Sequence, residues 1–271
     1  MGKFMADVTL DPKIASAFQC AGKRQLLTGG EGHSLRVGQC VFKPIENVER
    51  YSWSCDLLLK LTRRGFRISE PLRAIDGSFV YHGWAASNFE PGEHVTGRWH
   101  EKLNITRMFH SELNDIAFSP MPPSNDVWSL AHEITWQLTP LPPALHPKMT
   151  TMIEEIFNHY QPLSRYPGII HSDICGNVLF HEELDPCVID FSPAFGSVEY
   201  AEAILVADAI AWQNAPLDIV NLLPFNEHYR QYLLRAINFR IIVAALFKPK
   251  NIEWFLREYA GFQPVTSIVS Q

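Results

Sequence analysis

The segment HSDICGNVLF, from His171 to Phe180, is followed shortly by VIDFSP, from Val188 to Pro193. Both segments place polar side chains directly beside apolar, strand-like runs. Burying carboxylates and amides costs free energy unless they bind a partner. Asp173, Asn177 and Asp190 therefore form the candidate functional cluster of this sequence.

The runs NVLF and CVIDF flank the polar stretch HEELDP and predict a β-hairpin. This hairpin would bring Asn177, which precedes the first strand, and Asp190, which ends the second, to one pocket. Amide and carboxylate oxygens suit Mg²⁺, which commonly shares its coordination shell with phosphate groups. Asp173 would then be free to accept a proton from an attacking hydroxyl.

The order of His171, Asp173, Asn177 and Asp190 resembles the catalytic and metal-binding segments of protein-kinase-like enzymes, above all the aminoglycoside phosphotransferase family. The resemblance implies that Asp173 is the catalytic base, that Asn177 and Asp190 are metal ligands, and that His171 supports the loop. Asn177 follows Asp173 by four residues rather than five, and Ser192 replaces the glycine of D-F-G. The shortened loop is similar to that of an uncharacterised subgroup of phosphotransferase-like proteins.

The resemblance assigns an ATP site to the first third of the chain. In LTGGEGHSLRVG, the glycines have no Cβ and would let backbone amides approach a triphosphate closely. The residues implied in this loop are Gly29, Gly30, Glu31, Gly32 and Ser34.

Lys43 lies on the next predicted strand and shares a face with Val41, because side chains alternate along a strand. The resemblance makes Lys43 the lysine that contacts the α- and β-phosphates. Asp56, on the following helix, is the first choice for its acidic partner, and Glu49 is the second. The residues expected to form the hinge against adenine, mainly through backbone groups, are Ser87, Asn88 and Phe89.

The order of the predicted elements favours an α+β fold, because a strand-rich part precedes a helical part. Strand-like segments at 24–30, 33–38 and 39–45 precede a helix from about 47 to 64 and a hairpin that turns at Asp76-Gly77. The turn-rich stretch NFEPGEH, at 88–94, is the expected lobe boundary. Residues 1–88 would form the nucleotide-binding lobe and residues 89–271 the helical catalytic and acceptor-binding lobe, as in the two-lobed protein-kinase-like fold.

Helical spacing predicts five further helices in the second part of the chain, at about 99–113, 149–160, 199–211, 227–247 and 252–260. The last of these is expected to end before Gly261. Asp208 lies alone in an apolar helix, and because a buried carboxylate needs partners, we expect it to bond backbone near the catalytic loop. A direct role in the site is the alternative.

Composition limits the classes of partner. The net charge of −6 argues against nucleic acid and anionic membranes as partners. The five cysteines form no CxxC pair, which predicts neither a disulfide framework nor structural zinc and favours a reducing cytoplasm. The longest apolar run, Ala236–Phe247, is short and carries Arg240, so we expect no membrane span.

We therefore expect an ATP- and Mg²⁺-dependent phosphotransferase that acts on a hydroxyl of a small molecule. Only SPAFGSVEY separates Asp190 from the next helix, which leaves little room to dock a peptide. A catalytically weak or inactive nucleotide- or metabolite-binding protein is one alternative, motivated by the short loop and by Asp56. A metal-dependent phosphoesterase that uses His171, Asp173 and Asp190 is another, but it leaves Lys43 without a role.

Overall fold

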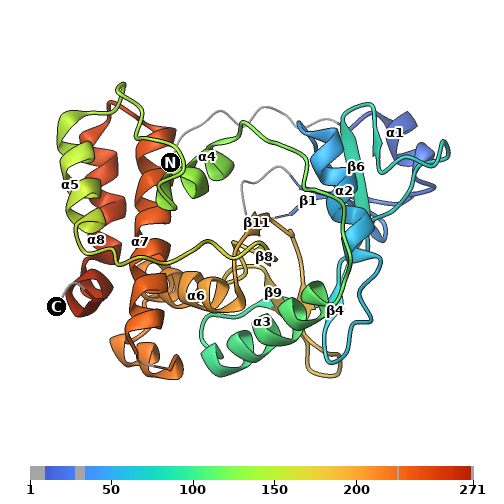
Figure 1. Cartoon of the computed structure of the whole chain (residues 1–271). Coiled ribbons are helices and arrows are strands. Elements are labelled where there is room, and N and C mark those ends of the chain that lie inside the picture. Colours follow the sequence, from blue (N-terminus) through green and yellow to red (C-terminus); the bar gives the residue numbers. More distant parts are fainter. Residues whose placement is uncertain (1–9, 28–33, 225, 270–271) are drawn as a thin grey trace.

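The computed structural model describes residues 10–27, 34–224 and 226–269. In its first part, strands and two helices alternate. These elements are α1 (Pro12–Ala17), β1 (Arg24–Leu26), β2 (Leu35–Val37), β3 (Cys40–Pro44), α2 (Val48–Leu58), β4 (Arg67–Ile68), β5 (Val80–Tyr81), β6 (Trp84–Asn88) and β7 (Glu93–His94). They lie mainly at one side of the molecule (Figure 1).

The second part is mainly helical, with two short β-pairs between its helices. Its elements are α3 (Trp99–Asn114), α4 (Val127–Thr135), α5 (Pro147–Phe157), β8 (Ile169–His171), β9 (Val178–Phe180), β10 (Cys187–Val188), β11 (Pro193–Phe195), α6 (Val198–Gln213), the 3₁₀-helix η1 (Leu217–Leu222), α7 (Glu227–Phe247) and α8 (Ile252–Val269). The predicted α+β architecture is therefore confirmed. No helix in the described ranges is long and apolar enough to cross a membrane.

The first sheet has the order β1-β2-β3-β6-β5, and each neighbouring pair is antiparallel. The three predicted strands of this region are confirmed as β1, β2 and β3. Lys43 lies opposite Ala85 of β6 in this register. Pairing with β6 therefore fixes the position of Lys43, the last residue but one of β3.

Helix α2 begins where Asn47 accepts a hydrogen bond from the backbone N–H of Arg50. It ends at Leu58, earlier than the predicted residue 64. The reason lies in α3, where the Glu112 carboxylate accepts hydrogen bonds of 2.8 Å from the backbone N–H groups of Arg63 and Arg64. These bonds hold the chain in a turn, with Arg63 in the left-handed region.

The hairpin between β5 and β6 turns at His82 and Gly83, which both have positive φ. The predicted turn at Asp76-Gly77 exists, but it closes a separate small loop in which the Ala74 N–H donates to the Ser78 carbonyl at 2.8 Å. The prediction of the hairpin turn was therefore wrong by six residues. Two-residue hairpin turns with positive φ at both positions match the twist of the strands, which explains the preferred position.

The second sheet, of order β4-β10-β9-β7, joins distant parts of the chain. The predicted hairpin is confirmed as β9 and β10, with Val188 opposite Val178. Strand β4, from the first 88 residues, pairs in parallel with β10. This sheet therefore connects the two sequence regions on either side of 88/89, directly beneath the candidate site.

The helices α6 and α7 lie at the centre of the larger apolar core and are covered by α4, α5 and α8. Helix α8 continues through Gly261, where we expected its end. A Cβ at this position would lie 3.0 Å from the Ala211 carbonyl oxygen of α6, so the glycine allows close helix packing rather than ending the helix. Helix α4 was not predicted from the sequence.

A smaller core of residues between Leu10 and Ala86 includes a disulfide between Cys20 and Cys40, which corrects the expectation of no disulfide. The two cysteines are brought together because Cys20 follows α1 and Cys40 begins β3. Cysteine spacing alone could not reveal this pairing, and the cysteine argument for a reducing cytoplasm is weakened.

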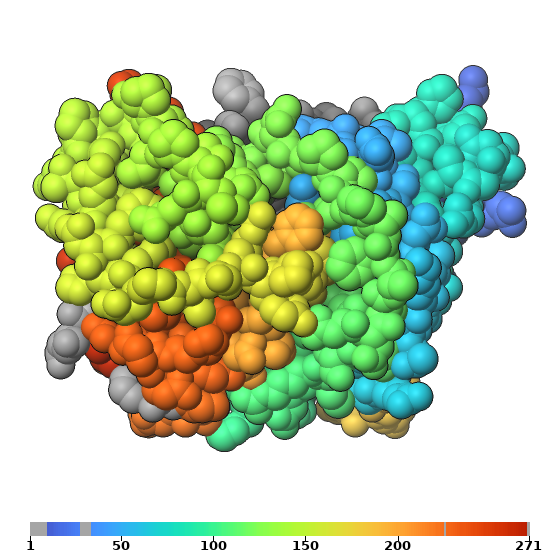
Figure 2. Space-filling model, in the orientation of Figure 1, coloured from blue at the N-terminus to red at the C-terminus, as the bar shows by residue number. Residues whose placement is uncertain are grey.

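The segment between α3 and α4, green in Figure 2, runs between the blue residues of the first lobe and the yellow and orange residues of the second. Its carbonyl groups accept hydrogen bonds from three side chains of the α2 region. The pairs are Asn47 with Pro123, Arg50 with Pro122 and Trp53 with Ser119. This segment therefore fixes α2 beside the candidate site.

Candidate active site

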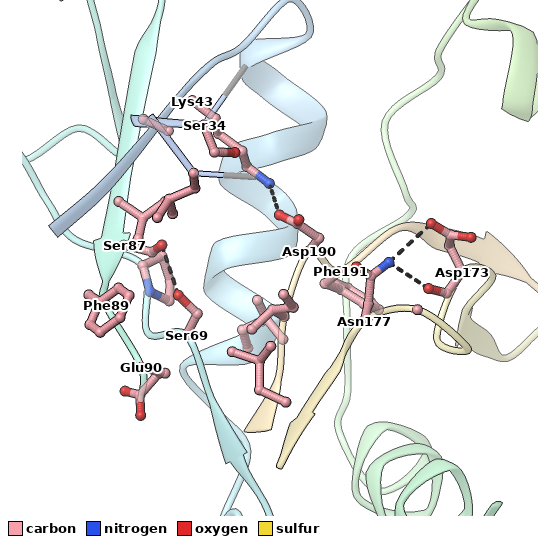
Figure 3. Close-up of a pocket in the computed structure, with 18 of the residues that line it drawn as sticks. Ser34, Lys43, Ser69, Ser87, Phe89, Glu90, Asp173, Asn177, Asp190 and Phe191 are labelled. Atoms are coloured by element: carbon pink, nitrogen blue, oxygen red, sulfur yellow. Dashed lines mark hydrogen bonds and ion pairs between the residues drawn. The ribbon is translucent and has the colours of Figure 1, made fainter. Parts of the chain in front are cut away.

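A cleft of about 780 Å³ lies between the first sheet, α2 and the β9–β10 hairpin. Residues from two distant parts of the sequence, 25–94 and 173–191, line it, and Figure 3 shows a close-up. The sequence-predicted residues among them are Ser34, Lys43, Ser87, Phe89, Asp173, Asn177 and Asp190. Gly29, Gly30, Glu31 and Gly32 lie outside the described residues.

Lys43 meets Asp190 in this cleft. Its ammonium lies 3.0 Å from Asp190 Oδ1, and the Tyr51 ring centroid lies 5.5 Å from Lys43 Nζ. Burial opposes ionisation of Asp190, but the Lys43 ammonium outweighs this effect and lowers the pKa of the carboxyl. Asp190 is thus held as a carboxylate where the β9–β10 hairpin meets the first sheet.

The predicted pair of Lys43 with Asp56 is not formed, and this assignment is corrected. Asp56 points from the exposed side of α2 to Arg73, at 3.1 Å. The neighbouring residue, Cys55, faces the cleft instead, because successive helical residues point about 100° apart. Glu49, the second choice, is exposed in the first turn of α2.

His171 is fully buried and organises the backbone around the loop. Its Nε2 donates to the Ile189 carbonyl at 3.1 Å, and its Nδ1 accepts from the backbone N–H of Asp173 at 3.2 Å and of Ser192 at 3.4 Å. Burial lowers the pKa of His171 and keeps it neutral. Both ring nitrogens are engaged with backbone groups, so His171 supports the loop and has no nitrogen left for a metal.

Asn177 is oriented by Asp173. Its Nδ2 donates to the Asp173 carbonyl at 2.6 Å and to Asp173 Oδ2 at 3.0 Å. The amide oxygen is therefore turned away from Asp173. Asp190, on the hairpin's other strand end, has a left-handed backbone with φ 49°, a strained conformation for a residue with a Cβ.

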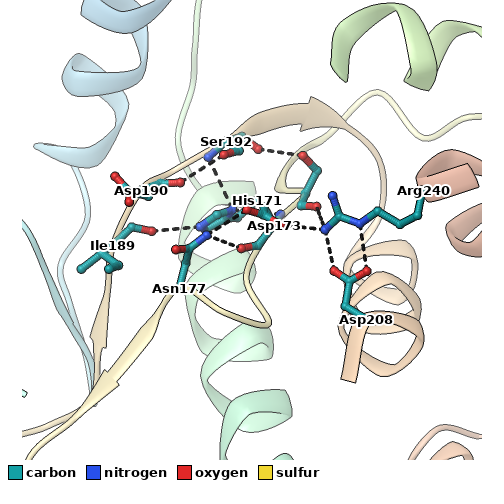
Figure 4. A network of polar contacts seen from close by, with 9 residues as sticks. His171, Asp173, Asn177, Ile189, Asp190, Ser192, Asp208 and Arg240 are labelled. Carbon is teal, nitrogen blue, oxygen red and sulfur yellow. Dashed lines mark hydrogen bonds and ion pairs between the residues drawn. The ribbon is translucent and has the colours of Figure 1, made fainter. Parts of the chain in front are cut away.

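Asp173 contacts a charged residue that the sequence analysis did not assign to the site. Arg240 Nη2, from α7, donates to Asp173 Oδ1 at 2.7 Å, and Arg240 Nε donates to Asp208 Oδ1 at 2.8 Å (Figure 4). Asp208 therefore bonds Arg240, and not the backbone as we expected. Burial raises the pKa of Asp208 to about 6, although the Arg240 guanidinium opposes this rise. The sequence feature that could have identified Arg240 is its position as a lone charged residue in the apolar run Ala236–Phe247.

The expected hinge is only partly turned to the cleft. The Asn88 N–H donates to the Glu70 carbonyl at 2.9 Å, its carbonyl accepts from the Ser69 hydroxyl at 2.7 Å, and the Phe89 N–H donates to the Gln39 carbonyl at 2.8 Å. These three backbone groups are therefore already paired within the protein. The N–H groups of Asn88 and Phe89 are therefore not available to adenine, whereas Ser87 and Phe89 line the cleft, and the hinge assignment stays a prediction.

The apolar walls of the cleft were not singled out from the sequence as site residues. Val41 and Ala85 lie on the sheet side, and Leu179 and Ile189 lie on the β9–β10 side. Alternation along β3 places Val41 on the same face as Lys43, so the sequence pattern could have predicted the sheet-side wall. The opposite wall required knowledge of how the two sheets face each other.

The side-chain oxygen atoms of Asn177 and Asp190 suit a hard cation as ligands. The Asn177 amide oxygen and the Asp190 carboxylate are oxygen ligands of the kind that Mg²⁺ binds together with phosphate oxygens. Among the described residues, no group of three or more His, Cys, Asp and Glu side chains could hold a metal ion on its own. The two oxygen ligands fit a metal that is bound partly by a substrate.

Solved structures resemble the whole chain. Aminoglycoside phosphotransferase APH(4)-Ia superposes with a TM-score of 0.61 at 13% sequence identity, over 95% of this chain and 96% of that chain. The chain has the protein-kinase-like fold. Choline kinase LicA from Streptococcus pneumoniae also gives a TM-score of 0.61 at 10% identity, over 93% of this chain and 97% of that chain.

A third structure with the protein-kinase-like fold is amicoumacin kinase hAmiN in complex with AMP-PNP, Ca²⁺ and Ami. It superposes with a TM-score of 0.60 at 13% identity, over 96% of this chain and 93% of that chain. No family profile and no curated protein matches the sequence. The fold is therefore established by structure, while the activity must be argued from the site.

Proposed function

We propose that this protein is an ATP- and Mg²⁺-dependent phosphotransferase that transfers the γ-phosphoryl group to a hydroxyl of a small molecule. The observation that carries the proposal is the convergence of Lys43, Asp173, Asn177 and Asp190 in one cleft. The hAmiN structure, with its nucleotide analogue and divalent cation, supports nucleotide and metal use within this fold. Localisation in the cytoplasm stays a prediction.

The residues of the cleft divide the chemistry among them. Lys43 and the loop around Gly29–Gly32 would bind the triphosphate, and adenine would lie between the walls formed by Val41 and Leu179. Asn177 and Asp190 would hold Mg²⁺, which when bound neutralises charge on the phosphate oxygens. Most of the rate acceleration would come from positioning and electrostatics rather than covalent chemistry.

Asp173 would act as the base. Its side chain is 45% exposed, although it is anchored by Arg240 and Asn177, so an acceptor can reach it from the cleft. It would orient the acceptor hydroxyl and take its proton as the new phosphorus–oxygen bond forms. A base of this kind contributes about 10²–10⁴-fold to a rate.

A small acceptor is favoured by the connection after Asp190. Strand β11 pairs directly with β8, and α6 begins at Val198, only eight residues after Asp190. No extended segment lies there to dock a peptide. The solved relatives of this fold are named for small molecules, namely aminoglycosides, choline and amicoumacin.

The test is a comparison of two variants, Asp190→Asn and Asp173→Asn. Mg·ATP should raise the Tm of the wild type more than ATP with EDTA does, because binding to the native state stabilises it. Asp190→Asn should lose this metal-dependent shift and all turnover. Asp173→Asn should keep the shift and lose turnover, which is followed as ATP hydrolysis and then with a panel of hydroxyl-bearing acceptors. An equal loss of Mg·ATP affinity in both variants would contradict the separate roles.

The second candidate is a nucleotide-binding protein of the same fold with weak or no catalysis. One observation favours it: the described part of α2 places no carboxylate against Lys43, which pairs with Asp190 instead. Stabilisation by Mg·ATP together with ATP hydrolysis that Asp173→Asn does not reduce would select this candidate.

A further inference from the structure

We propose that Arg240 is a positioning residue that holds the Asp173 carboxylate in place for proton transfer, and that Asp208 holds Arg240. This inference rests on the proposed function, in which Asp173 takes a proton. It assigns a role in the site to helix α7, whose Arg240 is 67 residues from Asp173 along the chain. Figure 4 shows the Arg240 guanidinium between the carboxylates of Asp173 and Asp208.

Arg240 links the base to the helical core through several hydrogen bonds. Its Nη2 donates to Asp173 Oδ1 at 2.7 Å, to the Ser172 carbonyl at 3.2 Å and to Asp208 Oδ2. Its Nε donates to Asp208 Oδ1 at 2.8 Å, so Asp208 binds the guanidinium through both oxygens. A planar guanidinium held in this bidentate way has a fixed direction, which a lysine could not reproduce.

Aromatic rings restrict the guanidinium further. Its central carbon lies 5.1 Å from the Trp212 ring centroid, 5.6 Å from that of Trp128 and 5.0 Å from that of Phe239. The Arg240 side chain is only 1% exposed. Packing and hydrogen bonds therefore hold the group that touches Asp173 in one orientation without a substrate.

Both oxygens of Asp173 are engaged. Arg240 binds Oδ1, and Asn177 Nδ2 binds Oδ2 at 3.0 Å. The carboxylate is thus held on opposite sides while the side chain stays open to the cleft. One guanidinium between two carboxylates leaves a net charge of about −1 on the three groups. Asp173 is the exposed carboxylate of the two, and it is the one that the acceptor proton would reach.

A purely structural ion pair would not need to reach the loop that carries Asp173. Glu202 provides the comparison, because it is also buried on α6 and pairs with Arg107, with Tyr229 donating to it at 2.8 Å. That cluster serves helix packing and has no contact with the catalytic loop among the described residues. Asp208 and Arg240 could satisfy each other in the same way, yet Arg240 also reaches Ser172 and Asp173.

The test uses Mg·ATP with water as the acceptor. In this reaction the water oxygen bonds to the γ-phosphorus, the bond to the β,γ-bridging oxygen breaks to leave ADP, and the water proton goes to Asp173. Arg240→Lys should lower the turnover number by about 100-fold, the lower end of the contribution of a positioned base. The Kd for Mg·ATP should stay within about twofold of the wild type, because nucleotide binding depends on Lys43 and Asp190. The matched control Glu202→Gln should leave both quantities unchanged.

A double-mutant cycle separates positioning from general stability. In an Asp173→Asn background, Arg240→Lys should cause no further loss of turnover, since Arg240 acts through the Asp173 carboxylate. Losses that multiply, or a loss in Arg240→Lys that is matched by weaker Mg·ATP binding, would overturn the inference.

Arg240→Lys could fail to fold, so a charge-balanced variant is included. Arg240→Met combined with Asp208→Leu removes a buried ion pair as a unit, a change that proteins often tolerate. Its crystal structure should show the Asp173 carboxylate displaced from its wild-type position; an unchanged carboxylate would refute positioning by Arg240. This readout needs no activity, so a wild type that neither binds Mg·ATP nor hydrolyses it would overturn the proposed function alone.

Discussion

We predict that His110 makes the region around His171 and Asp173 sensitive to acid. It lies on α3, fully buried, directly behind β8. Its Nδ1 donates to the Thr106 carbonyl at 2.6 Å, while its Nε2 accepts from the His171 backbone N–H at 2.9 Å. The ring therefore fits only in the neutral form, because protonation would place an N–H against the N–H of His171.

The size of the effect follows from the pKa of the buried histidines. Burial lowers the pKa of His110 to about 3, and burial together with the Arg240 charge lowers that of His132 to about 3. In the unfolded chain both would titrate near 6.5, so below this pH the unfolded state binds more protons and stability falls. Between pH 7.5 and 5, each histidine should lower the free energy of unfolding by about 2 kcal/mol. Two such losses are a large part of the ~5–15 kcal/mol stability of a typical domain.

Urea unfolding at pH 7.5 and pH 5 measures this loss, and the variant His110→Gln isolates the contribution of one histidine. A glutamine keeps one donor and one acceptor but cannot be protonated in this range. The difference in stability between the two pH values should therefore shrink by about 2 kcal/mol relative to the wild type. His100→Gln, which changes an exposed histidine of the same helix, is the control and should leave that difference unchanged. An identical pH dependence in His110→Gln and wild type would refute the reasoning.

Three further predictions concern other parts of the molecule. Replacing Cys20 and Cys40 by serine should lower the free energy of unfolding by about 3 kcal/mol, because the disulfide closes a loop of about 20 residues; urea denaturation of both forms measures this. Gly261→Val should lower the Tm and cost about 2 kcal/mol, since its side chain would overlap an α6 carbonyl; unchanged stability would contradict the close packing. Lys43→Met should change stability by less than about 1 kcal/mol, because its pair with Asp190 is part-exposed. The same variant should reduce Mg·ATP turnover by about 10² or more, as expected for a charge that stabilises the transition state.

Local sequence patterns predicted the parts of the fold that local forces decide. The alternation in QCVFKPI predicted β3 and the face that carries Lys43, and NVLF with CVIDF predicted the β9–β10 hairpin. Asn226, directly before the predicted helix 227–247, is the N-cap of α7, and its side chain accepts a hydrogen bond from the Tyr229 N–H. In each case the residues that determine the element lie within a few positions of it.

Features that depend on distant contacts were predicted less well. Helix α2 ends early because Glu112 of α3 binds the N–H groups that follow it. Gly261 ends no helix because its role is to let α8 approach α6. Asp56 was chosen by analogy of position, but one helical step turns it to Arg73 and turns Cys55 to the cleft. None of these partners can be read from the neighbouring sequence.

Arg240 shows how such a distant contact bears on function. It lies on α7, whose residues from Gln231 to Ala245 are buried, so its position is set by the packing of the whole helical core. The loop that carries Asp173 is short, and the His171 ring holds its backbone by accepting a hydrogen bond from the Asp173 N–H. The remaining freedom of Asp173 is the rotation of its carboxylate, which Arg240 and Asn177 restrict. A substitution in the core of α7 that shifts the helix would therefore move the proposed base without touching the cleft, and turnover would fall while Mg·ATP binding persisted.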